Sequence, residues 1–452
     1  MRKIWIVLVG LSACGDSNNA APDAPKAIDG AVVAPDAADP DALTTEQLAA
    51  IGQLSPLPTP PADLTNAFAD NPAAARLGQM LFFDKGYAGA LVVADDGTNG
   101  GLGQVGDTGK VACVSCHAPG SATLDDRRSN PSNVSLGVDF MTRNAPGIVN
   151  SSFYAWTNWG GRFDSQWSLP LAVAENVKIM KSTRLQVAHL LYAKYRTEYN
   201  AIFPVALDTR LDPLDANASQ LPAVGKPGDA AGYDGMAGAD KSIIDRIFAN
   251  YGKAIEAYIR LVVSRNSRFD QFVAGDRSAL THSEIRGLRL FLAKGCVACH
   301  SGPDLTDSDF HALVTPQTGL HVPATDLGRF TDVVPLLASP FNTAGVFSDN
   351  TQTGKLTNLV QVAAQTGQFR TKSLRDVATS GPYMHAGQFA TLADVITFYN
   401  AGGGDPGATG VVKDARMVPL GLSDADQADL VAFMGSLTGD PVAPALVVDT
   451  SN

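Results

Sequence analysis

The sequence CVSCH at residues 113–117 recurs as CVACH at residues 296–300. Each copy holds two cysteines three positions apart, followed at once by a histidine. This is the attachment pattern of c-type haem, in which two thiols add to the two vinyl groups of one porphyrin and the next residue lies beneath the iron. The two copies predict two covalently attached haems, each with two thioether bonds and one histidine ligand: Cys113, Cys116 and His117 for the first, and Cys296, Cys299 and His300 for the second.

Paired cysteines are also typical of zinc sites and of disulfides. A zinc site uses two such pairs that fold together, and it needs no histidine directly after each pair. Here the histidine follows both pairs, and the only other cysteine of the chain is Cys14. These observations favour haem attachment. Because the two motifs are far apart in the sequence, we expect each in a domain of its own.

Cys14 ends a leader that reads MRKIWIVLVGLSAC. Two basic residues precede a short apolar run, and LSAC resembles the cleavage site of bacterial lipoproteins. The apolar run is too short to span a bilayer. We therefore expect residues 1–14 to be a lipoprotein signal peptide, with export, cleavage before Cys14 and lipidation of that cysteine. The protein would then be periplasmic and held to a bacterial membrane only through this anchor. An ordinary signal peptide with a chance cysteine is the alternative.

Charge and composition limit the partners and the folded region. The 452 residues carry a net charge of −11, and nucleic acid is not expected as a partner because phosphate binding needs a basic face. Residues 15–45 are rich in Ala, Pro and Asp and cannot bury enough apolar surface to fold. We expect a disordered tether over 15–60, an N-terminal haem domain over 61–225 and a C-terminal haem domain over 226–445.

Helical patterns dominate the rest of the chain. Residues 240–263 repeat apolar side chains at helical spacing, and residues 280–295 and 422–437 resemble capped helices. Short helical stretches precede both haem motifs, and loops rich in Gly, Pro and Asp occupy residues 94–110 and 207–239. Few segments alternate as strands do. The sequence predicts a mostly α fold, with two cytochrome-c-like haem domains and long loops.

The stretch GPYMHAGQFATLADVITFYNAGGG at residues 381–404 contains three side chains that can bind a haem iron, namely Met384, His385 and Tyr399. TLAD is a capping box, so a helix is expected to begin there. Tyr399 then lies on the apolar face of that helix. The pattern alone makes Tyr399 an ordinary core tyrosine, whereas a thioether such as that of Met384 is the common partner of histidine in cytochromes.

Over residues 70–440 the chain resembles the bacterial di-haem cytochrome c peroxidases and their MauG-like relatives. The resemblance rests on motifs in the same order: LGQMLFFD, CVSCH, RNAPGIVN, WGGR, CVACH with SGPDLTD, FRTKSLRDV and GPYMH. In that family the N-terminal haem reacts with hydrogen peroxide, and the C-terminal haem delivers electrons or stores oxidising equivalents. A calcium ion usually lies between the domains. Members occur as monomers and as dimers, so either state is open here.

Several residues match functional positions of this family. Trp159 of WGGR matches a tryptophan that lies between the haems and can carry an electron, although a tryptophan is more often a core residue. Arg370 of FRTKSLRDV matches an arginine between the haems. Asn144 of RNAP, with the backbone carbonyls of Ser380 and Pro382, matches the calcium ligands, and calcium prefers such oxygen donors. The alternative is a structural role, in which the Asn144 side chain caps a turn.

The resemblance also supplies a peroxide-handling group. Glu175 matches the distal acid, which takes a proton from one peroxide oxygen and gives it to the other. The match is imperfect, because Asn176 follows where the family has methionine and the spacing from Pro170 is one residue short. A surface glutamate is the alternative. Gln166 matches another polar residue of the same site.

The chain departs from many relatives at the first haem. They carry a histidine eight residues before the Asn of RNAP, which caps the iron until the other haem is reduced. Here Leu136 holds that position, and no histidine occurs between His117 and His189. We therefore expect a first haem with His117 as its single protein ligand and a distal side open to peroxide. His189 is expected to be structural.

The second departure concerns the other haem. His385 matches a family histidine near it. Fourteen residues later, cytochrome c peroxidases place a methionine ligand and MauG-like enzymes a tyrosine. We expect Tyr399 to bind iron opposite His300, with Met384 as the competing ligand. A phenolate favours oxidised iron and lowers the potential, whereas a thioether raises it.

The leading hypothesis is thus a MauG-like di-haem peroxidase that reduces hydrogen peroxide and takes electrons from a protein side chain or a small redox protein. The first alternative is a conventional cytochrome c peroxidase fed by a mono-haem cytochrome. The second is a non-enzymatic di-haem electron carrier, against which the absent distal histidine argues.

Overall fold

The computed structural model describes residues 42–95, 101–120, 134–407 and 410–451, and helices dominate these ranges, as predicted. The one described sheet has two short antiparallel strands. The α-helices are α1 Thr45–Ile51, α2 Pro72–Phe83, α3 Ser168–Glu175, α4 Arg184–Ile202, α5 Gly238–Ile259, α6 Arg268–Val273, α7 His282–Ala293, α8 Arg329–Ala338, α9 Leu392–Asn400 and α10 Asp424–Ser436, and the strands are β1 Phe310–His311 and β2 Phe369–Arg370.

Local sequence signals explain where the predicted helices begin. Thr281 caps α7, Thr391 caps α9 and Ser423 caps α10, each in a capping box with an acidic residue three positions later. Such a box satisfies backbone N–H groups that have no partner inside the helix. The loop predicted at 207–239 contains short 3-10 turns before α5 begins at Gly238, and its carbonyl oxygens at Leu211 and Leu221 lie 3.1 Å from the two ring nitrogens of His189 on α4. His189 therefore has a structural role.

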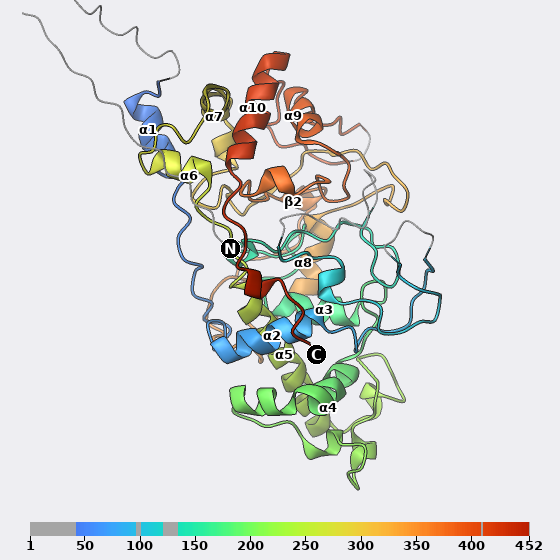
Figure 1. The fold of residues 1–452 in the computed structure, drawn as a ribbon. Coiled ribbons are helices and arrows are strands. Elements are labelled where there is room, and N and C mark those ends of the chain that lie inside the picture. The colour runs from blue at the N-terminus through green and yellow to red at the C-terminus, as the bar shows by residue number, and fades with distance from the viewer. Residues whose placement is uncertain (1–41, 96–100, 121–133, 408–409, 452) are drawn as a thin grey trace, which may run out of the picture. The chain divides into compact units, whose positions relative to one another are not determined.

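A first core forms where α2, α3 and α4 pack around α5 (Figure 1). The C-terminal half of α5 is buried on all sides, and both Tyr258 on this helix and Trp167 beside it are fully buried. α2 crosses α5 at Gly78, where an added Cβ would lie 2.6 Å from the carbonyl carbon of Ala254. Any larger residue at this position would hold the two helices apart.

A second core joins α7 and α10 with α1, α6 and α9 (Figure 1). Its closest helix crossing repeats the first one, because an added Cβ on Gly287 of α7 would lie 2.6 Å from the carbonyl carbon of Asp429 on α10. Gly78 and Gly287 both lie in the helix that precedes a haem motif. In both halves, a glycine at the helix crossing allows two helices to pack closely beside the haem motif.

The two cores change the domain boundaries that the sequence suggested. α5 belongs to the first core rather than to the C-terminal half predicted to begin at residue 226, and Phe269 is already part of the second core. Phe341 and Val442 return to the first core, so no single position divides the two. The predicted tether is also too long. α1 lies within residues 15–60, and its last residue, Ile51, is buried in the second core. A capping box at Thr44 and apolar residues at helical spacing stabilise this helix.

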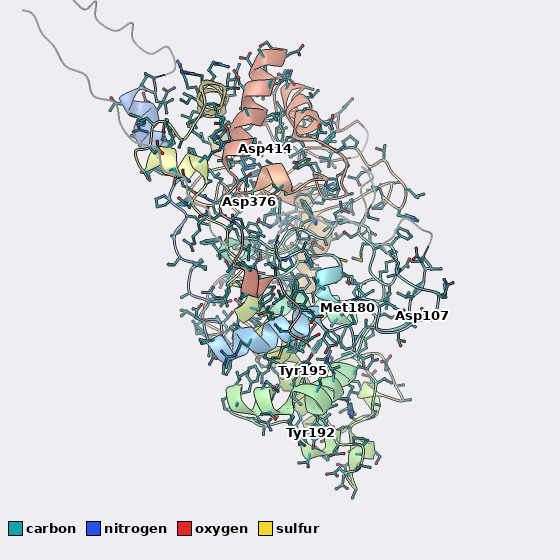
Figure 2. The ribbon with its side chains drawn as sticks, in the orientation of Figure 1. Asp107, Met180, Tyr192, Tyr195, Asp376 and Asp414 are labelled. Atoms are coloured by element: carbon teal, nitrogen blue, oxygen red, sulfur yellow. The ribbon has the colours of Figure 1, made fainter. Side chains whose placement is uncertain are left out.

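The chain crosses between the halves several times. The tail that follows α10 returns to α2 and α5, where Gln79 donates to the carbonyl of Ala445 and Tyr258 to that of Leu446 (Figure 1). Asp376, labelled in Figure 2, accepts hydrogen bonds from Asn150 and from the backbone of Gly439. These contacts hold both cores in one unit over the described part of residues 43–452.

Among the described residues, no helix is both long enough and apolar enough to cross a bilayer. Cys14, where we expect the lipid anchor, lies outside the described residues.

Candidate haem sites

The second haem motif forms one wall of an apolar cavity of about 270 Å³, which we call the C-terminal cavity. Gly295, with φ of 79°, reverses the chain after α7, and a 3-10 turn over Cys296–Ala298 follows. The backbone N–H of His300 donates to the carbonyl of Cys296, so both thiols and the imidazole line the cavity. The His300 Nδ1 lies 3.1 Å from the carbonyl oxygen of Leu305. When that contact is a hydrogen bond donated by Nδ1, Nε2 is left to bind a metal.

All three candidate ligands from residues 381–404 lie at the C-terminal cavity. Tyr399, from α9, and both Met384 and His385 line it. Burial raises the pKa of the Tyr399 phenol above its usual range. Burial also lowers the pKa of His385 to about 4, so its imidazole is neutral at physiological pH. The His385 ring stacks on Phe369, with 3.9 Å between the ring centroids.

The first motif forms the wall of a larger cavity of about 900 Å³, which we call the N-terminal cavity. Cys113, Cys116 and His117 line it, and the His117 N–H donates to the carbonyl of Cys113 as in the second motif. His117 is the only histidine among the described residues that line this cavity. Leu136, at the position where relatives carry a capping histidine, is fully buried and is not part of the lining.

The lining of the N-terminal cavity includes the two polar side chains that the sequence predicted there, Gln166 and Glu175. Gln166 lines it and donates to the carbonyl of Ser151. Glu175, at the end of α3, also lines it, and both of its carboxylate oxygens accept hydrogen bonds from Arg184 at 2.9 Å. Arg184 in turn donates to Asp245 of α5 at 2.6 Å. These two carboxylates raise the pKa of the Arg184 guanidinium, although burial alone would lower it.

Sequence reasoning missed Arg184. One local signal could have pointed to it, because Arg184 is the first residue of α4 and a cation there opposes the helix dipole. Such a residue is expected to have a carboxylate partner. The distant partner Asp245 could not be read from the sequence.

A wall of four residues lines both cavities, namely Gly147, Tyr154, Arg370 and Lys372. The Arg370 guanidinium carbon lies 3.8 Å from the ring centroid of Tyr154, and the Lys372 ammonium lies 4.7 Å from it. Trp159 lines the C-terminal cavity, and its indole N–H donates to the carbonyl of Asn144, which lines the N-terminal one. The structure therefore brings Trp159 and Arg370 to the junction of the cavities.

The cavities fit c-type haem. The four described cysteines are free thiols, so no disulfide competes for them. The two motifs line different cavities, which excludes a shared zinc site. Arg370 Nε and Lys372 Nζ are buried and make no hydrogen bond to any described residue, as expected of cations that pair with the carboxylates of a cofactor. Burial, with the Arg370 charge nearby, lowers the pKa of Lys372 well below its usual range.

One further group of residues has the composition of a metal site. Cys299, Asp307 and His311 lie together. His311 places one ring nitrogen 2.8 Å from Asp307 and the other 2.8 Å from Asp414. Because both nitrogens already have partners and Cys299 belongs to a haem motif, this group does not suit a separate metal ion.

Asn144 has a buried side-chain acceptor without a hydrogen-bond partner among the described residues. Its backbone N–H donates to the carbonyl of His385 at 2.7 Å, which brings it to the segment that holds Ser380 and Pro382.

Comparison with known proteins gives a consistent result. A family model described as "Di-haem cytochrome c peroxidase" matches residues 72–278. The chain is 31% identical over 405 residues to the cytochrome-c peroxidase IdrP1 of Denitromonas iodatirespirans, with 86% of each protein covered. It is 27% identical over 377 residues to the methylamine utilization protein MauG of Methylorubrum extorquens, covering 83% of this chain and 81% of that protein.

Solved structures show the same fold. A MauG-like protein associated with microbial copper homeostasis superposes with a TM-score of 0.56 at 24% identity, covering 88% of this chain and 97% of the other. The diheme peroxidase BthA from Burkholderia thailandensis gives a TM-score of 0.53 at 21% identity, covering 85% and 89%. The mostly α fold predicted from the sequence is confirmed.

Proposed function

Because the chain belongs to the di-haem cytochrome c peroxidase family, we propose that it reduces hydrogen peroxide in the N-terminal cavity and that the C-terminal cavity shares the oxidising equivalents. Electrons then come from a protein side chain or a small redox protein. When bound, haem supplies the iron at which peroxide is reduced by two electrons. The residues of this chain supply proton transfer, electron passage and the ligands that set the potential.

The distribution of carboxylates supports this division of roles. Glu175, Asp326 and Asp332 line the N-terminal cavity, whereas no carboxylate is among the described residues that line the C-terminal one. Peroxide reduction needs a group that moves a proton between the two peroxide oxygens. Glu175 can do so, and the Gln166 amide can orient the peroxide beside it. The C-terminal cavity lacks such a group and is suited to electron transfer.

The hydrogen bonds from Arg184 limit how Glu175 can accept a proton during the reaction. Oε1 of Glu175 accepts hydrogen bonds from both the backbone N–H and Nε of Arg184, whereas Oε2 accepts one from Nη2 and keeps a lone pair that can accept a proton. We propose that the pair stays together while one oxygen of Glu175 takes the peroxide proton. Arg184 then acts as a positioning residue for Glu175.

Peroxide added to the ferric protein tests the main proposal. With no histidine above the first iron, the reaction should proceed without prior reduction, and the haem absorption should change within the mixing time. Glu175→Gln should slow this reaction by about 10²–10⁴-fold, as for the loss of a general acid–base group. Glu198→Gln is the matched control, because Glu198 on α4 lines neither cavity. A requirement for pre-reduction would refute the open distal side.

We propose Tyr399 as the second ligand of the C-terminal haem. The raised pKa of its buried phenol means that the anion needs a nearby positive charge, and ferric iron supplies one. Tyr399→Phe should therefore change the haem spectrum and raise its potential, while Met384→Leu should change neither. The opposite result would identify Met384 as the ligand and favour a conventional peroxidase fed by a mono-haem cytochrome.

Trp159 is proposed as the electron path between the cavities. Trp159→Phe should leave both haem spectra intact and slow the transfer of electrons between the two haems.

Asn144 is proposed as a calcium ligand, with the carbonyls of Ser380 and Pro382. Removing calcium with a chelator should lower the unfolding temperature of the parent protein, whereas Asn144→Leu should abolish that response. Equal responses in both proteins would exclude Asn144.

The proposed location rests on residues 1–14. A lipid anchor at Cys14 predicts that the exported protein incorporates a labelled fatty acid and that Cys14→Ser does not. Labelling of the Cys14→Ser protein would refute the anchor.

A further inference from the structure

Lys372 occupies an unusual place, because its ammonium lies in the wall between the two haem cavities. It is one of the four residues that line both cavities. Its Nζ lies 4.7 Å from the ring centroid of Tyr154 and 5.2 Å from that of Trp159. When protonated, it places a positive charge beside the proposed electron path, in the same wall as Arg370.

No carboxylate of the described residues forms a hydrogen bond with this ammonium. Nζ is buried and has no hydrogen-bond partner there. The charge of Asp304 raises the Lys372 pKa in part, but this carboxylate makes no hydrogen bond to Lys372. Arg370, beside it in the wall, adds a second positive charge. Burying an ammonium without a counter-charge is strongly unfavourable.

Haem brings two propionate carboxylates, and the wall lines both of the cavities that would hold a haem. We propose that Lys372 binds a haem propionate and that its charge raises the reduction potentials of both haems. A positive charge between two irons stabilises the reduced, less positive state of each. It also disfavours a positive charge on the adjacent indole, so oxidising equivalents would pass through Trp159 without residing there. Only this last point rests on the proposed function.

The test is a redox titration of the full di-haem protein, followed by the absorption of each haem. Lys372→Met removes the charge and keeps the length of the side chain, so both midpoint potentials should fall. Lys372→Arg keeps the charge and should restore them. Lys355→Met is the control, because the half-buried Lys355 ammonium also lies beside an indole, 4.7 Å from the Trp156 ring centroid, but lines neither cavity. It should leave both potentials unchanged.

Unchanged potentials in Lys372→Met would overturn the proposal, and a shift at one haem alone would overturn the claim that one ammonium serves both. If Lys372→Met does not accumulate, Lys372→Gln provides the same loss of charge in a polar side chain. The titration uses no peroxide. A protein that fails to react with peroxide can still pass this test, so failure of the proposed function and failure of this inference are distinguishable.

Discussion

Replacing Gly287 by alanine tests the helix crossing that supports the C-terminal haem motif. The new Cβ would lie 2.6 Å from the carbonyl carbon of Asp429 and 2.8 Å from the Cβ of Phe433. Ordinary contacts begin at about 3.4 Å or more, so α7 and α10 must separate by roughly 1 Å. Backbone atoms on α10 cannot rotate away as a side chain would.

The expected cost follows from overpacking. Extra atoms in a well-packed core cost about 1–3 kcal/mol, occasionally more, and a clash with backbone belongs at the upper end. About 3 kcal/mol changes the unfolding equilibrium roughly 100-fold. Guanidinium unfolding, followed by far-UV circular dichroism and by the absorption of the C-terminal haem, measures this change as a lower midpoint. Gly78→Ala should have a similar effect on the first core, where Ala254 takes the place of Asp429.

Gly435→Ala is the internal control, because Gly435 lies on α10 of the same helix pair and an added Cβ would meet nothing within 4 Å. Alanine is the better helix former there and should stabilise the protein by about 0.5–1 kcal/mol. The two substitutions are therefore expected to have opposite signs. If Gly287→Ala instead matched Gly435→Ala, α7 and α10 would not approach as closely as described.

Three further predictions concern the supporting contacts. The Asp270 pKa would be raised by burial, but hydrogen bonds from Arg375 hold it below its usual range. This carboxylate stabilises the fold above about pH 4, and the stabilisation is lost as pH falls through the depressed pKa. The urea midpoint of the parent protein should therefore fall below pH 4, and this fall should be smaller in Asp270→Asn. Ile51→Ala should cost about 2–5 kcal/mol in urea unfolding, because Ile51 is 1% exposed. Arg184→Met should cost about 3 kcal/mol in the same assay, because it leaves two partly buried carboxylates without their cation.

Each of these has an outcome that would contradict it. An Asp270→Asn protein with the parent's acid sensitivity would mean that other groups control it. An Ile51→Ala protein as stable as the parent would mean that α1 does not pack on the second core in solution. An Arg184→Met protein with unchanged stability would show that water solvates both carboxylates well enough to replace the lost guanidinium.

Features encoded in short stretches could be predicted from the sequence. The spacing of Cys296, Cys299 and His300 places all three on one cavity, because a single turn carries them. Capping boxes located the starts of α7, α9 and α10 for the same reason. The inward direction of Tyr399 followed from helical periodicity.

Features that depend on distant partners were missed. Periodicity showed that α5 is an amphipathic helix, but it cannot tell which core the helix joins, so the domain boundary fell too early. The predicted tether included α1 because the prediction relied on average composition, and a single capping box at Thr44 does not change that average. Lys372 could be seen in FRTKSLRDV, but its importance arises from the two cavities that meet around it.

The two haem motifs share one scaffold, yet their cavities are suited to different chemistry because different segments complete them. The turn from α3 to α4 brings Glu175 and its partner Arg184 to the N-terminal cavity. α9 brings Tyr399 to the C-terminal cavity, and the neighbouring His385 is held neutral by burial, with its pKa lowered to about 4. A neutral imidazole whose ring nitrogens contact Thr315, Gln317 and Gln388 is a poor source of protons. Because Tyr399 is also the proposed second ligand in the C-terminal cavity, a carboxylate placed there should allow a reaction with peroxide only when Tyr399 is replaced as well, and the duplicated scaffold alone should not.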